Sequence, residues 1–227
     1  MTSPSPPLPV VLERELTVEK VLASQERLLR VGRATVHVAS LGETAVSYGV
    51  GVRKTAPYLA RAREDQVSVV PRASGGTGLV HFPGDLVWAV ILPRADPRVG
   101  RGFVRAYDRF GQGLVDMLAA RGISTRWVGP MGLSEDYCPL SRRGLVLDCE
   151  GRVLAAAAQH ATGTTLLHAG SLSRTLDRRS VARWFGLPEP GPADRLTCLT
   201  EVGVHASPDE LAHSLGSHLV AALQREV

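Results

Sequence analysis

The chain has 227 residues, of which 44% are apolar and 5% aromatic, and it carries a formal net charge of +4. This length and apolar content suit one folded domain whose core is built mostly from Ala, Val and Leu. Four surplus positive charges scattered along the chain do not predict nucleic-acid binding, although they would suit an acidic protein partner.

The first ten residues (MTSPSPPLPV) are rich in Pro and Ser, so we expect a flexible N-terminus over 1–10 and one domain over 11–227. They lack a basic start and a long apolar stretch, and no run in the chain approaches the ~18 apolar residues of a membrane span. Cys138, Cys149 and Cys198 match no metal-site spacing, and Cys149 and Cys198 are expected to be small core residues. We therefore expect a cytoplasmic protein without a membrane segment, a disulfide or a metal.

Apolar periodicity predicts, in chain order, a helix over 17–30, strands at 35–39, 44–48, 67–71 and 85–93, a helix over 102–121, strands at 125–128, 144–149, 153–158 and 164–172, and helices near 178–185 and 208–225. Thr17 is the predicted N-cap of the first helix, and Ser207 with Glu210 predicts a capping box at the last. The run 85–93 (DLVWAVILP) is nearly all apolar and predicts a central strand buried on both faces. The order of elements predicts an α/β (α+β) single domain with a central mixed or antiparallel sheet flanked by helices.

A glycine-rich loop with polar neighbours follows the third strand, in VVPRASGGTGLVHFPGDL (69–86). Its candidate ligand-binding residues are Arg72, Ser74, Gly75, Gly76, Thr77, Gly78 and His81. Bare backbone N–H groups beside a guanidinium can bind a phosphate or carbonyl oxygen, and His81 is predicted to begin the next extended stretch. The spacing is neither a P-loop nor a dinucleotide fingerprint, and taken alone a structural hairpin explains it equally well.

Three segments resemble, in the right order, signatures of the lipoate-protein ligase, octanoyltransferase and biotin ligase superfamily. Residues 72–86 resemble R-x-S-G-G-G-x-x-x-H-x-x-G-x-L. Residues 150–173 (EGRVLAAAAQHATGTTLLHAGSLS) resemble the segment that opens G-R-K-I-x-G-x-A-Q and ends L-x-H-G-S-L, and 195–211 (RLTCLTEVGVHASPDEL) resemble the closing stretch. The resemblance implies the biotin and lipoate ligase (BPL/LPL) catalytic-domain fold, with the glycine loop lying over an acyl chain.

The chain departs from the family pattern at a lysine. The lysine of G-R-K falls on Val153, after Gly151 and Arg152, while a later glycine of that segment falls on Ala156 and the third loop glycine on Thr77. A valine can neither donate a hydrogen bond nor offset developing negative charge, and losing one such group costs on the order of 10²–10³ in rate. Whether activity survives without this lysine is left open by the sequence.

Cys138 lies fifteen positions before Val153, a layout similar to that of the cysteine-dependent octanoyltransferases of the superfamily. The resemblance implies that the cysteine carries the octanoyl group as a thioester, and a thiolate is a good acyl acceptor near neutral pH. Arg142 and Arg143 would lower the pKa of the thiol, whereas Glu135 and its acidic neighbour would oppose that shift. The alternative is an inert cysteine.

The remaining candidates each have a functional and a structural interpretation. His81 either contacts substrate or orients the loop as a structural hydrogen-bonding group, and Arg152 is either a phosphate contact or a solvent-facing residue. The run 155–158, with Ala155 and Ala156 among the candidate substrate-binding residues, suits a strand lining an acyl channel or simply close sheet packing. His168 is expected to be structural.

The resemblance implies an acyltransferase that moves an octanoyl or lipoyl group from a carrier thioester to a lipoyl-domain lysine through Cys138. Expected partners are acyl carrier protein and lipoyl-domain proteins such as E2 subunits and the glycine cleavage H protein. Transfer would need no cofactor, whereas a ligase would need ATP. The alternatives are a catalytically impaired lipoate- or acyl-binding protein, an accessory subunit of a second ligase chain, or an ATP-dependent lipoate-protein ligase.

Overall fold

A computed structural model describes residues 8–99, 103–128, 136–140 and 144–225. Its main sheet has seven strands in the order β1-β2-β6-β10-β9-β8-β7. The strands are β1 (Val10–Leu16), β2 (Thr35–Leu41), β6 (Leu86–Pro93), β7 (Thr125–Val128), β8 (Leu145–Asp148), β9 (Val153–Ala161) and β10 (Thr165–Leu172). Only the β1–β2 pair is parallel among these neighbours, which confirms the expected mixed sheet.

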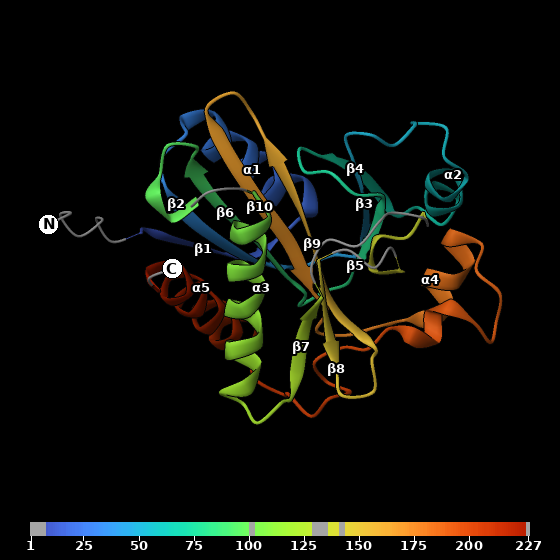
Figure 1. Cartoon of the computed structure of the whole chain (residues 1–227). Coiled ribbons are helices and arrows are strands. Elements are labelled where there is room, and N and C mark those ends of the chain that lie inside the picture. The colour runs from blue at the N-terminus through green and yellow to red at the C-terminus, as the bar shows by residue number, and fades with distance from the viewer. Residues whose placement is uncertain (1–7, 100–102, 129–135, 141–143, 226–227) are drawn as a thin grey trace, which may run out of the picture.

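A smaller sheet in the order β4-β3-β5 lies beside the main one (Figure 1). Its strands are β3 (Ala45–Gly49), β4 (Ser68–Arg72) and β5 (Gly78–His81). The helices are α1 (Val18–Val31), α2 (Pro57–Glu64), α3 (Phe103–Ala119), α4 (Arg178–Phe185) and α5 (Pro208–Gln224), with short 3₁₀ turns η1 (Pro97–Val99), η2 (Cys138–Leu140) and η3 (Pro192–Arg195).

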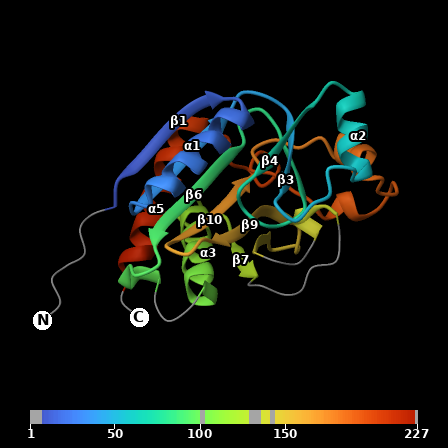
Figure 2. The same ribbon diagram turned by 90° about the horizontal axis from the view of Figure 1, so that it is seen from above.

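Helices cover both faces of the main sheet, with α1 on one face and α3 and α5 on the other (Figure 2). The central strand β6 serves both layers. Trp88 and Val90 belong to the core shared with α3 and α5, whereas Val87 and Ala89 face the α1 layer. Because successive side chains of a strand point to opposite faces, a strand buried on both sides must be apolar throughout. The predicted central strand is confirmed.

A second core joins the small sheet to α2 and α4, which lie next to each other in Figure 1. The rings of Tyr58 on α2 and Phe185 on α4 stack with their centroids 4.5 Å apart. A Cβ on Gly78 would stand 2.4 Å from the Phe185 ring and 2.7 Å from the Tyr58 ring, so the start of β5 requires glycine. The end of the glycine loop, at Gly78, therefore packs against this core.

Both predicted helix starts are confirmed. Thr17 Oγ1 accepts a hydrogen bond from the Lys20 N–H at the start of α1. At α5, Ser207 Oγ accepts from the Glu210 N–H while Glu210 Oε2 accepts from the Ser207 N–H.

Several expectations about local structure are wrong. The predicted flexible N-terminus over 1–10 is too long, because Leu8 is buried and β1 begins at Val10. His81 ends β5 instead of beginning a strand. Cys149 is not a core residue, because it is exposed and lies in the turn between β8 and β9, where Gly151 has a φ of +79°. β1, α2 and most of β5 were not predicted from the sequence.

None of the helices in the described part of the chain is long and apolar enough to cross a membrane.

Candidate functional site

A cavity lies where α1, the small sheet, the glycine loop, η2 and strands β9 and β10 meet. It holds about 440 Å³, part of which opens to solvent. Its walls are formed by Val18, Val21, Leu22, Gln25, Ser47, Arg72, Ser74, Leu79, His81, Val87, Cys138, Ala156, Ala157, Ala158, Ala169 and Gly170. A mostly apolar wall with a few polar groups is typical of a small-molecule site.

Small side chains on β9 and β10 make room for this cavity. Ala156 and Ala158 on β9 line it together with Ala169 on β10. Larger residues at these three positions would fill part of the cavity, whereas a Cβ on Gly170 would stand 2.2 Å from Trp88. Ala156, Ala157 and Ala158 thus border this cavity, whereas Ala155 packs into the core on the other face and also borders a second cavity.

Arg72, at the end of β4, holds the glycine loop in its folded shape. The guanidinium is buried and donates from Nη1 to Ser47 Oγ (3.1 Å) and from Nη2 to the carbonyl oxygens of Gly75 (3.1 Å) and Thr77 (2.7 Å). Burial lowers the pKa of Arg72, whereas an ionised Cys138 nearby would raise it. Since arginine stays protonated in proteins, the loop encloses a fixed positive charge.

Cys138 approaches the same loop from η2. Its segment pairs with β5, because the Gly78 N–H donates to the Asp136 carbonyl oxygen at 2.8 Å. The Cys138 side chain is buried and lines the cavity. A Cβ on Gly76 would lie 3.2 Å from Cys138 Sγ and 2.9 Å from Arg72 Nη2, and Gly76 has a φ of +87°. The thiol and the guanidinium therefore converge on a bare glycine Cα.

His81 is a neutral hydrogen-bonding group that joins the two sheets. Its Nε2 lies 2.8 Å from Ser47 Oγ on β3, and its Nδ1 lies 3.4 Å from Ser171 Oγ on β10. Burial and the positive charge of Arg72 lower the pKa of His81 to about 3. The imidazole is therefore uncharged at neutral pH, and its contacts connect the loop to the main sheet.

Val153, where the family pattern has lysine, lines a second cavity of about 270 Å³. The wall is formed by Leu79, Tyr137, Pro139, Val153, Leu154, Ala155, Ala156, Ser171, Ser173, Leu176, Leu196 and Thr197. Leu79 and Ala156 face both cavities. Among the described residues around it, this second cavity offers hydroxyl groups but no charged side chain.

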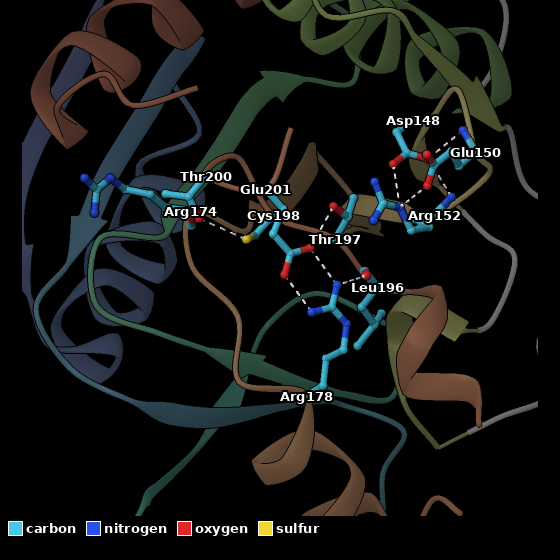
Figure 3. Close-up of polar contacts among 10 residues, drawn as sticks. All are labelled: Asp148, Glu150, Arg152, Arg174, Arg178, Leu196, Thr197, Cys198, Thr200 and Glu201. Atoms are coloured by element: carbon cyan, nitrogen blue, oxygen red, sulfur yellow. Dashed lines mark hydrogen bonds and ion pairs between the residues drawn. The ribbon is translucent and has the colours of Figure 1, made fainter. Parts of the chain in front are cut away.

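Arg152 lines neither cavity and instead pairs with two carboxylates in the turn before β9 (Figure 3). Its Nε lies 2.9 Å from Asp148 Oδ2 and 3.2 Å from Glu150 Oε2. Those partners satisfy the charge and keep the side chain at the turn. Of the two interpretations of Arg152, the geometry favours the structural one.

A second arginine clasp holds the segment that borders the second cavity (Figure 3). Arg178 donates to both carboxylate oxygens of Glu201 at 2.6 Å and to the Leu196 carbonyl oxygen at 2.8 Å. Thr197 Oγ1 also donates to Glu201 Oε2, at 3.2 Å. Nothing in the local sequence indicates these contacts, because Arg178 and Glu201 are 23 residues apart.

The structure gathers most of the predicted site residues and separates a few. Around the first cavity or the loop that borders it lie Arg72, Ser74, Gly75, Gly76, Thr77, Gly78, His81, Cys138 and Ala156. Val153 and Ala155 belong to the second cavity, which adjoins the first. The expected influence of Glu135, Arg142 and Arg143 on the thiol concerns side chains outside the described residues.

Two polar residues that line the first cavity, Ser47 and Gln25, were not predicted from the sequence. Ser47 lies on β3, and nothing in its local sequence marks it. Gln25 lies in the apolar stripe of α1, four residues after Val21 and three after Leu22. A polar residue at a position where the helix pattern expects an apolar one could have indicated its role.

Two other residues are structural, as expected. His168 is fully buried against the rings of Tyr107 and Phe110, on the α3 side of the sheet. Cys198 is buried, with its Sγ 3.2 Å from Thr200 Oγ1. Within the described ranges, no three His, Cys, Asp or Glu residues come together as a metal site would require.

Comparisons with known proteins agree with this architecture. Residues 17–219 match the family described as the lipoyl protein ligase A/B catalytic domain. Octanoyltransferase LipM of Staphylococcus epidermidis is 27% identical over 126 residues, which is 52% of this chain and 45% of that protein. LipM of Bacillus cereus is 25% identical over 142 residues, 59% of this chain and 51% of the relative. The matches thus span about half the length of these curated relatives.

Solved structures share the fold at low identity. A lipoate-protein ligase A bound with ATP has a TM-score of 0.77 at 17% identity, covering 97% of this chain and 88% of its own. The bipartite lipoate protein ligase of Thermoplasma acidophilum, described with its E2 lipoyl domain, has a TM-score of 0.72 at 17% identity, covering 97% and 86%. Because the family match covers most of the chain, the protein belongs to the lipoyl protein ligase A/B catalytic domain family.

Proposed function

We propose that this protein is an acyltransferase that moves an octanoyl or lipoyl group from a carrier thioester to a lysine of a lipoyl domain, with Cys138 as the acyl acceptor. The observation that carries the proposal is the position of Cys138. Its thiol lies in the wall of an apolar cavity, beside the buried guanidinium of Arg72. A cation next to a thiol favours the thiolate, which is the nucleophilic form.

The reaction would proceed in two balanced steps. The Cys138 thiolate attacks the carbonyl carbon of the carrier thioester, a new C–S bond forms, and the carrier leaves as a thiol after taking up a proton. The amine of the acceptor lysine then attacks the Cys138 thioester, forming an amide and returning the cysteine thiol. Splitting the transfer in this way replaces one difficult encounter with two easier ones, and neither step consumes ATP.

The second cavity supports transfer over ATP-dependent ligation. A ligase must stabilise an acyl-adenylate phosphate, and Val153 stands where the family pattern places a lysine. No charged group among the lining residues of that cavity replaces it. The partners we propose are an acyl carrier protein as donor and lipoyl-domain proteins, such as E2 subunits or the glycine cleavage H protein, as acceptors in the cytoplasm.

The test is intact-protein mass spectrometry after mixing the protein with octanoyl-carrier protein. We expect a mass gain of one octanoyl group that hydroxylamine removes, and we expect the gain to disappear in Cys138→Ala. Cys149→Ala is the matched control, because Cys149 is exposed and lines neither cavity. Adduct formation that persists in Cys138→Ala would contradict the proposal.

The replacement of the family lysine by Val153 also favours a second candidate, a lipoate- or acyl-binding subunit that lacks transfer chemistry of its own. Its signature would be reversible binding of an acyl chain with no covalent adduct, whether octanoyl-carrier protein or ATP with free lipoate is supplied. Recovery of activity on adding a lysine-containing ligase subunit would establish the accessory role.

A further inference from the structure

Gln25 is a buried polar residue in the apolar wall of the first cavity. It lies on the face of α1 that carries Val18, Val21 and Leu22, and its side chain is 3% exposed. The other walls of this cavity include the alanines of β9 and Ser74 at the start of the glycine loop. Every other α1 residue that lines the cavity is aliphatic.

The amide nitrogen of Gln25 has no hydrogen-bond partner among the described residues. A buried donor without an acceptor is costly, since the group gives up its hydrogen bonds to water and gains none in return. An aliphatic residue of similar size, such as leucine, would fit the helix stripe without that cost. The unpaired Gln25 amide therefore costs free energy in the protein without ligand, and a ligand that accepts its hydrogen bond would remove that cost.

The kind of ligand follows from the donor. A saturated chain has no acceptor and would leave the Gln25 N–H groups unpaired. A chain with an oxygen or sulfur acceptor beyond its carboxyl end would pair with them, with oxygen the stronger and thioether-like sulfur the weaker acceptor. Inside a low-dielectric cavity such a bond is worth more than the same bond in water.

We infer that Gln25 is a specificity-determining residue that selects acyl chains carrying a hydrogen-bond acceptor over plain saturated chains of the same length. The inference rests on the proposed function for the identity of the ligand as an acyl chain. It goes further in naming the substrate class and the residue that recognises it. Gln25 lies on α1, whereas Arg72 and Cys138 lie on β4 and η2, so its expected effect is on binding of the chain.

Binding is measured by calorimetry in the full-length Cys138→Ala protein, so that acyl transfer cannot interfere. The probes are octanoate, octanoates with one keto group at successive chain carbons in turn, and lipoate. We expect the best keto-octanoate to bind about threefold to tenfold more tightly than octanoate, the worth of one added hydrogen bond. In Gln25→Leu we expect that preference to vanish, with octanoate binding at least as well as before.

The matched control is Leu22→Met, a volume-conserving change on the same wall that leaves the amide in place and should keep the preference. Gln25→Met replaces Gln25→Leu if the latter does not fold. A sensitivity to Gln25 found with lipoate alone would identify the ring sulfur as the acceptor. An unchanged ratio of affinities in Gln25→Leu would overturn the inference while leaving the proposed function intact. Failure of every probe to bind would also overturn the inference, whereas the proposed function is decided by octanoyl loading of Cys138 from the carrier protein.

Discussion

Cys138 Sγ and Arg72 Nη2 approach the same point, the position that a Cβ on Gly76 would occupy, to 3.2 Å and 2.9 Å. The glycine thus keeps a nucleophile and a buried cation close together without a side chain between them. In such a site a negative charge on sulfur and the positive guanidinium stabilise each other more strongly than they would in water. The glycine loop therefore brings the thiol and the guanidinium to one position.

Gly76→Ala should abolish acyl loading of Cys138, because the added methyl group would collide with the guanidinium and the thiol. Gly203→Ala is the matched control, since Gly203 also has a φ of +87° but nothing within 4 Å of an added Cβ. Both variants should lose roughly 1–2 kcal/mol of unfolding free energy from left-handed strain. Only Gly76→Ala should lose the octanoyl adduct in mass spectrometry, and equal loading of the two variants would refute this role for the loop.

Arg72→Met should slow acyl loading and alkylation of Cys138 at neutral pH, since it removes the neighbouring positive charge that would stabilise a thiolate. The measurement is the rate of iodoacetamide alkylation at pH 7 in a Cys149→Ala background. Arg72→Lys keeps the charge but cannot reach Ser47 Oγ and both carbonyl oxygens at once. It should therefore keep more of the alkylation rate while destabilising the loop. An alkylation rate that is the same in Arg72→Met and the parent would count against the electrostatic argument.

His168→Leu should make the protein less sensitive to acid. Burial lowers the pKa of His168 to about 3, so the unfolded chain binds its proton near 6.5 while the folded chain does not. Stability is therefore lost as pH falls below that value, and removing the histidine removes this loss. Relative to the parent, the variant should gain roughly 2 kcal/mol of unfolding free energy on going from pH 8 to pH 5, measured by urea denaturation. A gain independent of pH would show that His168 titrates normally.

Arg178→Met should cost up to about 1 kcal/mol at neutral pH, because the clasp with Glu201 is about one-third exposed and partly screened by solvent. The hydrogen bond from Arg178 lowers the pKa of Glu201, so this contribution is present above pH 4.5 and fades as pH falls through the lowered value. Thermal unfolding at pH 7 and at pH 3 measures it. Equal losses at both values would mean that packing of the arginine stem, not the ion pair, dominates.

The sequence predicted the elements that long, regular patterns specify. The all-apolar run of β6 and the capped, amphipathic α1 and α5 appear as expected. Elements whose signal is short or tertiary were missed. α2 has eight residues and no side-chain cap, and β5 has four residues that are buried through contacts with distant helices. Such elements form because the rest of the fold covers them.

The candidate site shows the same division. The loop motif made Arg72 and His81 candidates, and the spacing to Val153 made Cys138 one. The sequence could not indicate that Ser47 joins Arg72 to His81, since the three lie on different strands and meet only when the small sheet forms. Cys149 was wrongly predicted to be a core residue, because the apolar residues before it do not indicate that a turn begins there.

The contacts of Ser47 have a consequence for how this family can vary. Its hydroxyl accepts from Arg72 and lies against His81, whose other nitrogen faces Ser171 on the main sheet. Exchanging one of these residues alone would leave its neighbours with unmet polar groups in a buried place. Among descendants of a common ancestor, the serine, the arginine and the histidine should therefore be inherited, or abandoned, as a set.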